Sequence, residues 1–329
     1  MLLRLGLLGG ALALAASRGY LNSRKLKLRE IEVRLKNLPL CFDGIKIGQM
    51  TDIHAGPLVS REFIREGVDR LMANSPDLVV LTGDFMNGNR RILRRSQGNG
   101  RFKQYHYDYC IHELGKLRAP LGVYGVLGNH DFWSGKNYAS GIACDLERAG
   151  IRMLRNRAVP LQCDGEHLYL IGVDDYWADS YDLSLATKNL PRNGCRVLLC
   201  HNPDVNEDIN QRGERIDLVI SGHTHGGQVV LPFVGFPYLL SPFGQKYLAG
   251  LVRDGDRQSY ISCGLGAYLA PIRLNCPPDV SVLTLRRQAK MVYLSQSSQR
   301  RSVFRAERRN NSALSRTLCS LAKRARGSL

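Results

Sequence analysis

The segment Ser221-Gly222-His223-Thr224-His225-Gly226-Gly227 places two imidazoles one residue apart, directly after the apolar run at residues 216–220. In an extended backbone, side chains at positions i and i+2 point to the same side, so both rings could reach one small volume. The flanking glycines allow another group to approach the backbone closely. Imidazoles are common metal ligands, and the pair therefore indicates metal chemistry. Because such a pair is weak evidence by itself, the prediction depends on further ligands elsewhere in the chain.

Four other apolar runs end in short turns that carry ligand-type side chains. With the histidine pair they offer two carboxylates, one amide and five imidazoles: Asp52, His54, Asp84, Asn129, His130, His201, His223 and His225. So many nitrogen and oxygen donors exceed the needs of one tetrahedral zinc and suit two adjacent ions of the manganese, iron or zinc type. Two ions about 3.5–4 Å apart can stabilise both oxygens of a phosphoryl displacement and lower the pKa of an attacking water.

Strands and helices must bring these turns together. Short apolar runs alternate with longer helical segments along the chain. The sequence predicts strands at residues 31–38, 46–50, 78–81, 122–127, 159–162, 167–173, 196–200, 216–220, 259–263 and 280–285. It predicts helices at residues 60–74, 107–117 and 138–149, and long loops at 87–103 and 231–243. This alternation indicates an α/β layered fold, in which sites lie at the carboxyl ends of strands.

Charge is distributed unevenly over the 329 residues, whose net charge is +17. Residues 286–329 hold twelve Lys or Arg and one acid, Glu307, a net charge of +11, so the rest of the chain carries only +6. Nine cysteines are scattered without a Cys-x-x-Cys pair. Their odd number and their spacing argue against a disulfide framework or a zinc knuckle and favour a reducing compartment.

The sequence predicts that both terminal segments lie outside the central domain. Residues 1–29 contain a twelve-residue apolar stretch, Leu5 to Ala16, followed by a basic cluster. The stretch is short against the roughly 20 residues that span a bilayer as a helix. It predicts an uncleaved or peripheral membrane anchor, with a cleaved export signal or a flexible leader as the alternatives. Residues 287–329 are predicted to be a basic tail, either disordered or an amphipathic helix.

Taken in chain order, the motifs resemble those of the calcineurin-like metallophosphoesterase family. They are Asp-x-His, Gly-Asp, Gly-Asn-His-Asp, a strand-end histidine and Gly-His-x-His. The resemblance covers residues 46–225 and continues to about residue 285. It implies a metallophosphoesterase domain over residues 30–286, built as a four-layer α-β-β-α sandwich with a dimetal site at the strand ends. Two manganese ions are expected at this site, with iron and zinc as the alternatives.

The resemblance also implies a role for each motif residue. The first ion would be held by Asp52, His54 and His225. The second would be held by Asn129, His201 and His223, and Asp84 would bridge the two. His130 would bind the phosphate and protonate the leaving oxygen, steadied by Asp131. A bridging position suits a carboxylate because each of its two oxygens can face one cation.

The segments 222–228, 264–266 and 271–274 resemble a membrane-associated bacterial subgroup of these enzymes. That resemblance implies hydrolysis of UDP-2,3-diacylglucosamine to UMP and 2,3-diacylglucosamine 1-phosphate in lipid A synthesis, at the cytoplasmic side of the bacterial inner membrane. The apolar loop at 231–240 and the basic amphipathic tail fit a lipid-linked phosphorylated substrate and an anionic membrane surface. Another phosphodiester or phosphate substrate is the main alternative.

A nuclease or a nucleic-acid binder is the less favoured class. The basic tail would bind nucleic acid without sequence specificity, and no motif predicts a specific nucleic acid or a protein partner. The arginines at residues 90–101 are predicted to form either a solvated face or a cationic collar for phosphate. His106, His112 and His167 belong to no motif, and Trp177 is predicted to pack as a lid or edge contact.

Overall fold

The computed structural model describes residues 14–87, 100–133, 136–191, 193–231, 241–243, 245–268 and 270–288, with only the backbone of residues 101–103 and 136. The chain divides into two units after Gln288, and all described residues belong to the first. The predictions for nearly all of the basic tail, for the arginines at 90–95 and for most of the apolar loop at 231–240 lie outside the described residues.

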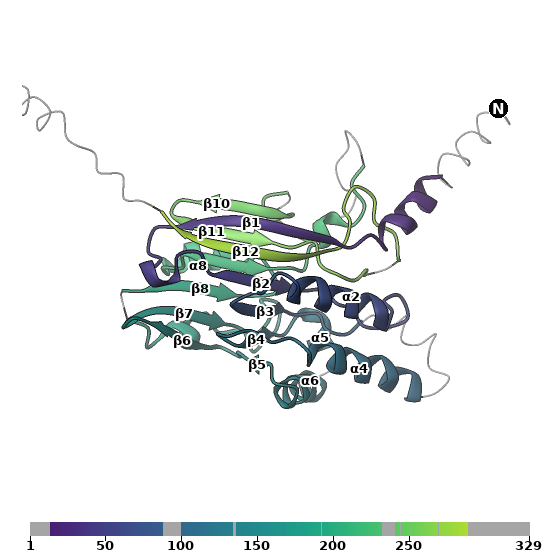
Figure 1. The fold of residues 1–329 in the computed structure, drawn as a ribbon, viewed down its shortest axis with the longest axis horizontal. Coiled ribbons are helices and arrows are strands. Elements are labelled where there is room, and N and C mark those ends of the chain that lie inside the picture. Colours follow the sequence, from purple (N-terminus) through teal and green to yellow (C-terminus); the bar gives the residue numbers. More distant parts are fainter. Residues whose placement is uncertain are drawn as a thin grey trace, which may run out of the picture. The chain divides into compact units, whose positions relative to one another are not determined.

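Two six-stranded sheets form the centre of the first unit (Figure 1). The first has the order β1 (Lys27–Leu35), β12 (Asp279–Arg287), β2 (Lys46–Met50), β3 (Leu78–Thr82), β4 (Val123–Val126) and β5 (Arg152–Met153). The second has the order β10 (Gly250–Asp254), β11 (Arg257–Ile261), β9 (Leu218–Ser221), β8 (Cys195–Leu199), β7 (Glu166–Gly172) and β6 (Arg157–Cys163). Strands β2, β3 and β4 are parallel, as are β7, β8 and β9, so their carboxyl ends share an edge of each sheet.

Helices cover the outer face of each sheet. They are α2 (Arg61–Met72), α4 (Gly100–Leu114) and α6 (Lys136–Arg148) on the first sheet, and α7 (Leu183–Thr187) and α8 (Val205–Arg212) on the second. A separate apolar core fills the space between the sheets and includes Val80 of β3 and Leu199 of β8. The predicted four-layer α-β-β-α sandwich is therefore confirmed.

Local sequence explains the elements that carry the site. The Ser60 side chain caps α2 by accepting a hydrogen bond from the Phe63 amide, and Ile64, Val68 and Leu71 recur on the buried face at helical spacing. Strand β3, Leu78–Thr82, is buried along its whole length, as expected for a central parallel strand covered on both faces. The turns that carry the predicted site residues therefore follow rigid strands.

Helix α4 corrects one prediction. The polar segment at residues 87–103 was expected to be a loop, but α4 begins at Gly100 and is longer than the predicted helix at 107–117. A contact of the added turns accompanies the difference: His106 is buried, and its Nδ1 lies 2.8 Å from the Tyr109 hydroxyl, which donates to the Val59 carbonyl just before α2. Tertiary contact favours helix where composition alone suggests a loop.

Glu113 of α4 is fully buried and joins the two helices. It accepts hydrogen bonds from Arg61 Nε at 2.6 Å and Arg65 Nη2 at 3.3 Å, and it also pairs with Lys116. Burial alone would raise the pKa of this carboxyl, but the hydrogen bonds from Arg65, Lys116 and Arg61 lower it to about 2. The ionised carboxylate therefore stabilises the α2–α4 contact.

We expect Glu113→Gln to lower the free energy of unfolding by about 1–2 kcal/mol at neutral pH, since charge-assisted hydrogen bonds are weakened. A depressed pKa stabilises the folded state above the unfolded pKa, so this difference should shrink as the pH falls from about 4.5 towards about 2. Urea unfolding over that range measures it. Glu147→Gln, at an exposed pair with Arg157, is the control and should change little. A difference independent of pH would contradict the prediction.

Residues 14–22 form a helix that precedes β1. Its Leu14 and Leu21 side chains are exposed, and Arg24 stacks on the Tyr20 ring at 4.5 Å. No helix within the described ranges combines the length and the apolar character needed to cross a bilayer.

Candidate dimetal site

The predicted site residues meet where the strands of both sheets end. Asp52 and His54 follow β2, Asp84 follows β3, and Asn129 and His130 begin the short helix α5 (Asn129–Trp133) after β4. From the second sheet, His201 follows β8, while His223 and His225 follow β9, with His225 opening the turn η2 (His225–Gly227). All eight side chains are buried.

One group joins Asp52, His54 and His225, whose ligand atoms lie within 4.8 Å of one another. The Nε2 atoms of His54 and His225 are 3.0 Å apart, and the two rings stack with centroids at 4.9 Å. Asp52 Oδ1 lies 3.4 Å from His225 Nε2. These are the three side chains that the family resemblance assigns to the first ion.

Asp84 lies between the two halves of the site. Its Oδ2 atom is 3.5 Å from His54 Nε2 and 3.2 Å from His201 Nε2, while Oδ1 accepts the backbone N–H of His130 at 2.9 Å. This position is the one that a bridging carboxylate requires.

The remaining predicted ligands lie on the His201 side. His223 Nδ1 is 3.0 Å from Asn129 Oδ1, and the His201 and His223 rings meet edge to face at 5.1 Å. His223 and His225 therefore face different partners, although only Thr224 separates them in the chain. The division of the pair between two ions stays a prediction, and this difference in partners is what it requires.

His201 tests whether the donor set fits a cation. Its Nδ1 lies 2.7 Å from the Thr82 carbonyl, which can only accept, so Nδ1 carries a proton and Nε2 is the nitrogen that faces the site. Nε2 points at the Asp84 carboxylate inside a fully buried site. A positive charge must lie between these two groups, 3.2 Å apart, either as a second proton on Nε2 or as a metal ion, and the residues therefore fit a metal site.

The pKa directions agree with this electrostatic arrangement. Burial lowers the pKa of His54 and of His223 to about 3, which keeps both imidazoles neutral, the form that binds metal. For His201, burial opposes charge, but the carboxylates of Asp84 and Asp52 raise the pKa well above its ordinary value. A metal ion would satisfy the same negative charge in place of the proton.

The backbone at these turns is unusual. Five of the seven predicted metal ligands have a left-handed conformation: Asp52 (φ 49°), His54 (φ 47°), Asp84 (φ 55°), His223 (φ 72°) and His225 (φ 51°). Such φ values are uncommon outside glycine and cost energy, and they concentrate at functional sites.

Gly222 shows how tightly the turns pack. A Cβ atom there would lie 2.2 Å from both Asp52 Oδ2 and Thr51 Oγ1. The hydrogen bonds from the His223 amide to the Asp52 carboxylate, at 3.0 and 3.1 Å, depend on this approach. Only glycine leaves room for the Asp52 carboxylate at this position.

We therefore expect Gly222→Ala to displace Asp52 and to reduce hydrolysis by at least about a hundredfold, since a shift of about 1 Å in a reacting site has effects of this size. Metal content, measured by mass spectrometry of the dialysed protein, should fall as well. Gly141→Ala is the matched control, because a Cβ atom at Gly141 in α6 meets nothing within 4 Å. Equal activity of the two variants would contradict the packing argument.

Asp131 binds the backbone behind the site. Its carboxylate accepts the amides of Gly128 at 2.9 Å, Asp84 at 3.1 Å, Phe85 at 3.1 Å and Met86 at 3.3 Å. It thereby connects the turn after β3 to the turn after β4. The His130 ring meets the His54 ring edge to face at 4.8 Å and the Tyr268 ring at 5.0 Å.

Two further side chains lie beside the site: the sequence predicts no role for Arg273, and it predicts Trp177 as a lid or edge contact. The fully buried Arg273 donates from Nη2 to the Gly264 carbonyl at 3.1 Å, and the same nitrogen lies 3.2 Å from His225 Nδ1. The Trp177 ring meets the His223 ring edge to face at 4.5 Å, and the Trp177 side chain is 45% exposed. Trp177 therefore lies at the solvent-facing edge of the site. The sequence signal for Arg273 is a charged residue within the otherwise apolar segment Pro271-Ile272-Arg273-Leu274.

Known proteins of one family are similar in sequence to this chain. Residues 45–227 match the family model described as calcineurin-like phosphoesterase. The uncharacterized metallophosphoesterase YkuE of Bacillus subtilis is 30% identical over 281 residues, which cover 83% of this chain and 92% of that protein. An uncharacterized metallophosphoesterase of Aquifex aeolicus is 33% identical over 81% of this chain and 94% of its own length. Phosphodiesterase YaeI of Escherichia coli is 33% identical over 73% of this chain and 82% of its own length.

The fold and the donor set define a dimetal phosphoesterase. The chain belongs to the calcineurin-like phosphoesterase family and is a metal-dependent hydrolase.

Proposed function

We propose that the chain hydrolyses the pyrophosphate bond of UDP-2,3-diacylglucosamine, giving UMP and 2,3-diacylglucosamine 1-phosphate, with two manganese ions. The observation that carries the phosphoesterase chemistry is the position of Asp84 between His54 and His201. When bound, the two ions supply Lewis-acid stabilisation of the phosphoryl group and a water of lowered pKa.

The chain's own residues would supply the remaining functions. Asp52, His54 and His225 would hold one ion, Asn129, His201 and His223 the other, and Asp84 both. His130, buried beside the Asp84 carboxylate group, would bind a phosphate oxygen and give a proton to the leaving oxygen. Asp131 would keep the two turns in register through its four backbone hydrogen bonds.

A cavity of about 710 Å³ supports an acylated substrate. It lies between the helix at residues 14–22, α2, α4 and the loops that follow His54 and precede Tyr268. Apolar and aromatic side chains contribute much of its lining: Tyr20, Leu58, Val59, Phe63, Tyr105, Tyr109, Leu265, Ala267 and Pro271. Its volume suits a lipid-sized ligand, and the loops that line it are continuous with those that carry the metal ligands.

The substrate proposal is tested by comparing three substrates with manganese: UDP-2,3-diacylglucosamine, an aryl phosphodiester and single-stranded DNA. Release of UMP and acylated sugar phosphate from the first, at much higher kcat/KM than from the others, is expected. Leu58→Trp should raise KM for the acylated substrate and leave aryl diester turnover unchanged. Turnover of the aryl diester alone would overturn the substrate while retaining the phosphoesterase, and preferential cleavage of DNA would favour a nuclease.

We also propose attachment to the cytoplasmic side of the bacterial inner membrane. Exposed Leu14 and Leu21 lie on a helix that contains Arg18 and is followed by Arg24 and Lys25, and these residues support contact with an anionic surface. Deleting residues 1–17 is expected to move most of the protein from the membrane fraction to the supernatant, as measured by fractionation and immunoblotting. Replacing Lys188, an exposed residue outside this segment, by Gln serves as a charge control. Unchanged fractionation of the deletion would contradict the proposal.

A further inference from the structure

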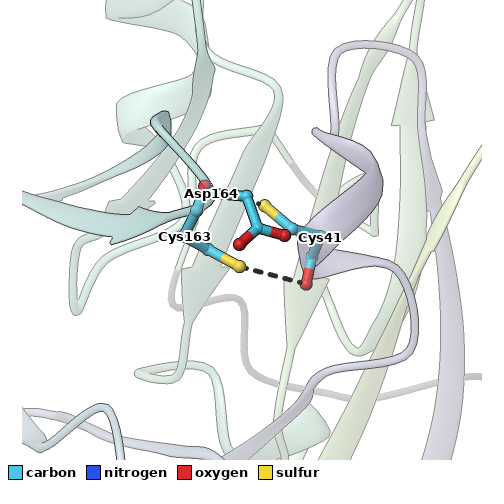
Figure 2. A group of neighbouring side chains, drawn as sticks. All are labelled: Cys41, Cys163 and Asp164. Carbon is cyan, nitrogen blue, oxygen red and sulfur yellow. Dashed lines mark hydrogen bonds between the residues drawn. The ribbon is translucent and has the colours of Figure 1, made fainter.

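A second group of metal-ligand side chains lies outside the candidate dimetal site and consists of Cys41, Cys163 and Asp164 (Figure 2). Cys41 belongs to the turn η1 (Leu40–Phe42) between β1 and β2, Cys163 ends β6, and Asp164 begins the turn to β7. One ligand atom of each residue lies within 4.8 Å of the other two. Segments 122 residues apart in the chain thus bring together two thiols and a carboxylate.

This thiol group lies at the opposite ends of the strands from the dimetal site. Strand β2 starts after Cys41 and ends just before Asp52, and β7 starts after Asp164 and ends just before the loop that contains Trp177. With about 3.3 Å per residue, these strands separate the two groups by roughly 15 Å or more. Neither thiol can therefore be a ligand of the dimetal site.

The two thiols face each other and are accessible. Cys41 Sγ donates to the Cys163 carbonyl at 3.1 Å, and Cys163 Sγ donates to the Cys41 carbonyl at 3.6 Å. Both cysteines are half-buried and Asp164 is exposed, so an ion can enter from solvent. Figure 2 shows the Asp164 carboxylate beside both sulfur atoms.

The chemistry of the group favours a thiophilic cation. Partial desolvation, the adjacent Cys163 thiol and the Asp164 carboxylate raise the pKa of Cys41 to about 11, because each of them disfavours a negative charge on its sulfur. A divalent cation at this position reverses that effect and favours the thiolate. Thiolates select zinc and related soft ions over magnesium or calcium, and zinc accepts two sulfurs and one carboxylate oxygen with a fourth position open to solvent.

We propose that Cys41, Cys163 and Asp164 form a binding site for a zinc-type cation. Each bound ion displaces two thiol protons to solvent and leaves the oxidation state of both sulfurs unchanged. The ion joins a turn of the first sheet to the β6–β7 turn of the second, and so crosslinks the two sheets at the end remote from catalysis. An ion that binds only this folded arrangement stabilises it.

Cadmium titration of the reduced full-length protein tests the site, because thiolate–cadmium bonds give an ultraviolet charge-transfer band that imidazole and carboxylate ligands do not. We expect a band that saturates at one ion per chain. Cys41→Ser and Cys163→Ser should abolish it, and Asp164→Asn should weaken binding at least about tenfold. Cys144→Ser, which removes an exposed thiol in α6, is the control and should retain the band.

Zinc content gives an independent measure. The wild type should hold one zinc more per chain than Cys41→Ser, while aryl phosphodiester turnover of the two proteins should be equal. A band that survives Cys41→Ser, equal zinc content, or a Cys41–Cys163 disulfide in peptides from the isolated protein would each overturn the proposal. Asp164→Asn changes an exposed turn residue, so its result does not depend on whether the cysteine variants fold.

Discussion

Replacing Asp84 by alanine is expected to lower phosphodiester hydrolysis by at least about a thousandfold, which corresponds to about 4 kcal/mol of transition-state stabilisation. The reason is the position of its carboxylate, with Oδ2 at 3.5 Å from His54 Nε2 and 3.2 Å from His201 Nε2. Without it, four buried imidazoles, Asn129 and Asp52 must hold the cations alone. Initial rates on an aryl phosphodiester with manganese measure the loss, and mass spectrometry measures the accompanying fall in metal content.

Asp279→Asn is the matched control for Asp84→Ala. Asp279 is also a buried carboxylate, but it accepts a hydrogen bond from the Ser262 hydroxyl at 2.6 Å and belongs to none of the ligand groups. This variant should retain most of the wild-type rate. If Asp84→Ala keeps its circular dichroism spectrum and more than about a tenth of the activity, Asp84 does not bridge two ions.

The second large effect is expected from His130→Ala. General acid catalysis contributes about 10²–10⁴-fold, so hydrolysis should slow by this factor while two ions per chain are retained. The loss should be greatest for substrates with poor leaving groups, because these depend most on protonation of the leaving oxygen. Rates over a series of aryl phosphodiesters of different leaving-group pKa measure this dependence.

The metal content of His130→Ala separates an acid from a ligand. His130 belongs to a group with His54 and Asp84 whose ligand atoms lie within 4.8 Å, so a ligand role is geometrically open to it. Loss of an ion from the variant would contradict the assignment as an acid. His112→Ala, at an exposed position of α4, is the control and should match the wild type in both rate and metal content.

Local sequence was sufficient for the strands that support the site. The predicted strand at residues 46–50 coincides with β2, and the prediction at 78–81 misses only the last residue of β3. Buried parallel strands are continuous apolar runs with polar turns at their ends, and this signal needs no tertiary information. Elements with less distinct apolar faces are harder to predict from the sequence. The predicted helix at 107–117 starts later than α4, and no prediction covers α8, Val205–Arg212.

The sequence by itself determined the family, the sandwich and the set of side chains that meet at the strand ends, because ligand types and their order are properties of the chain. Residue spacing did not determine which of them are neighbours: the two groups of ligands were predicted only from the family resemblance, and the tertiary structure decides how the side chains lie. Left-handed φ values turn His223 towards Asn129 and His225 towards His54, a divergence that i, i+2 spacing does not predict. The tertiary structure also brings Cys41 next to Cys163. Contacts between distant segments follow from sheet packing and leave no signal in the local sequence.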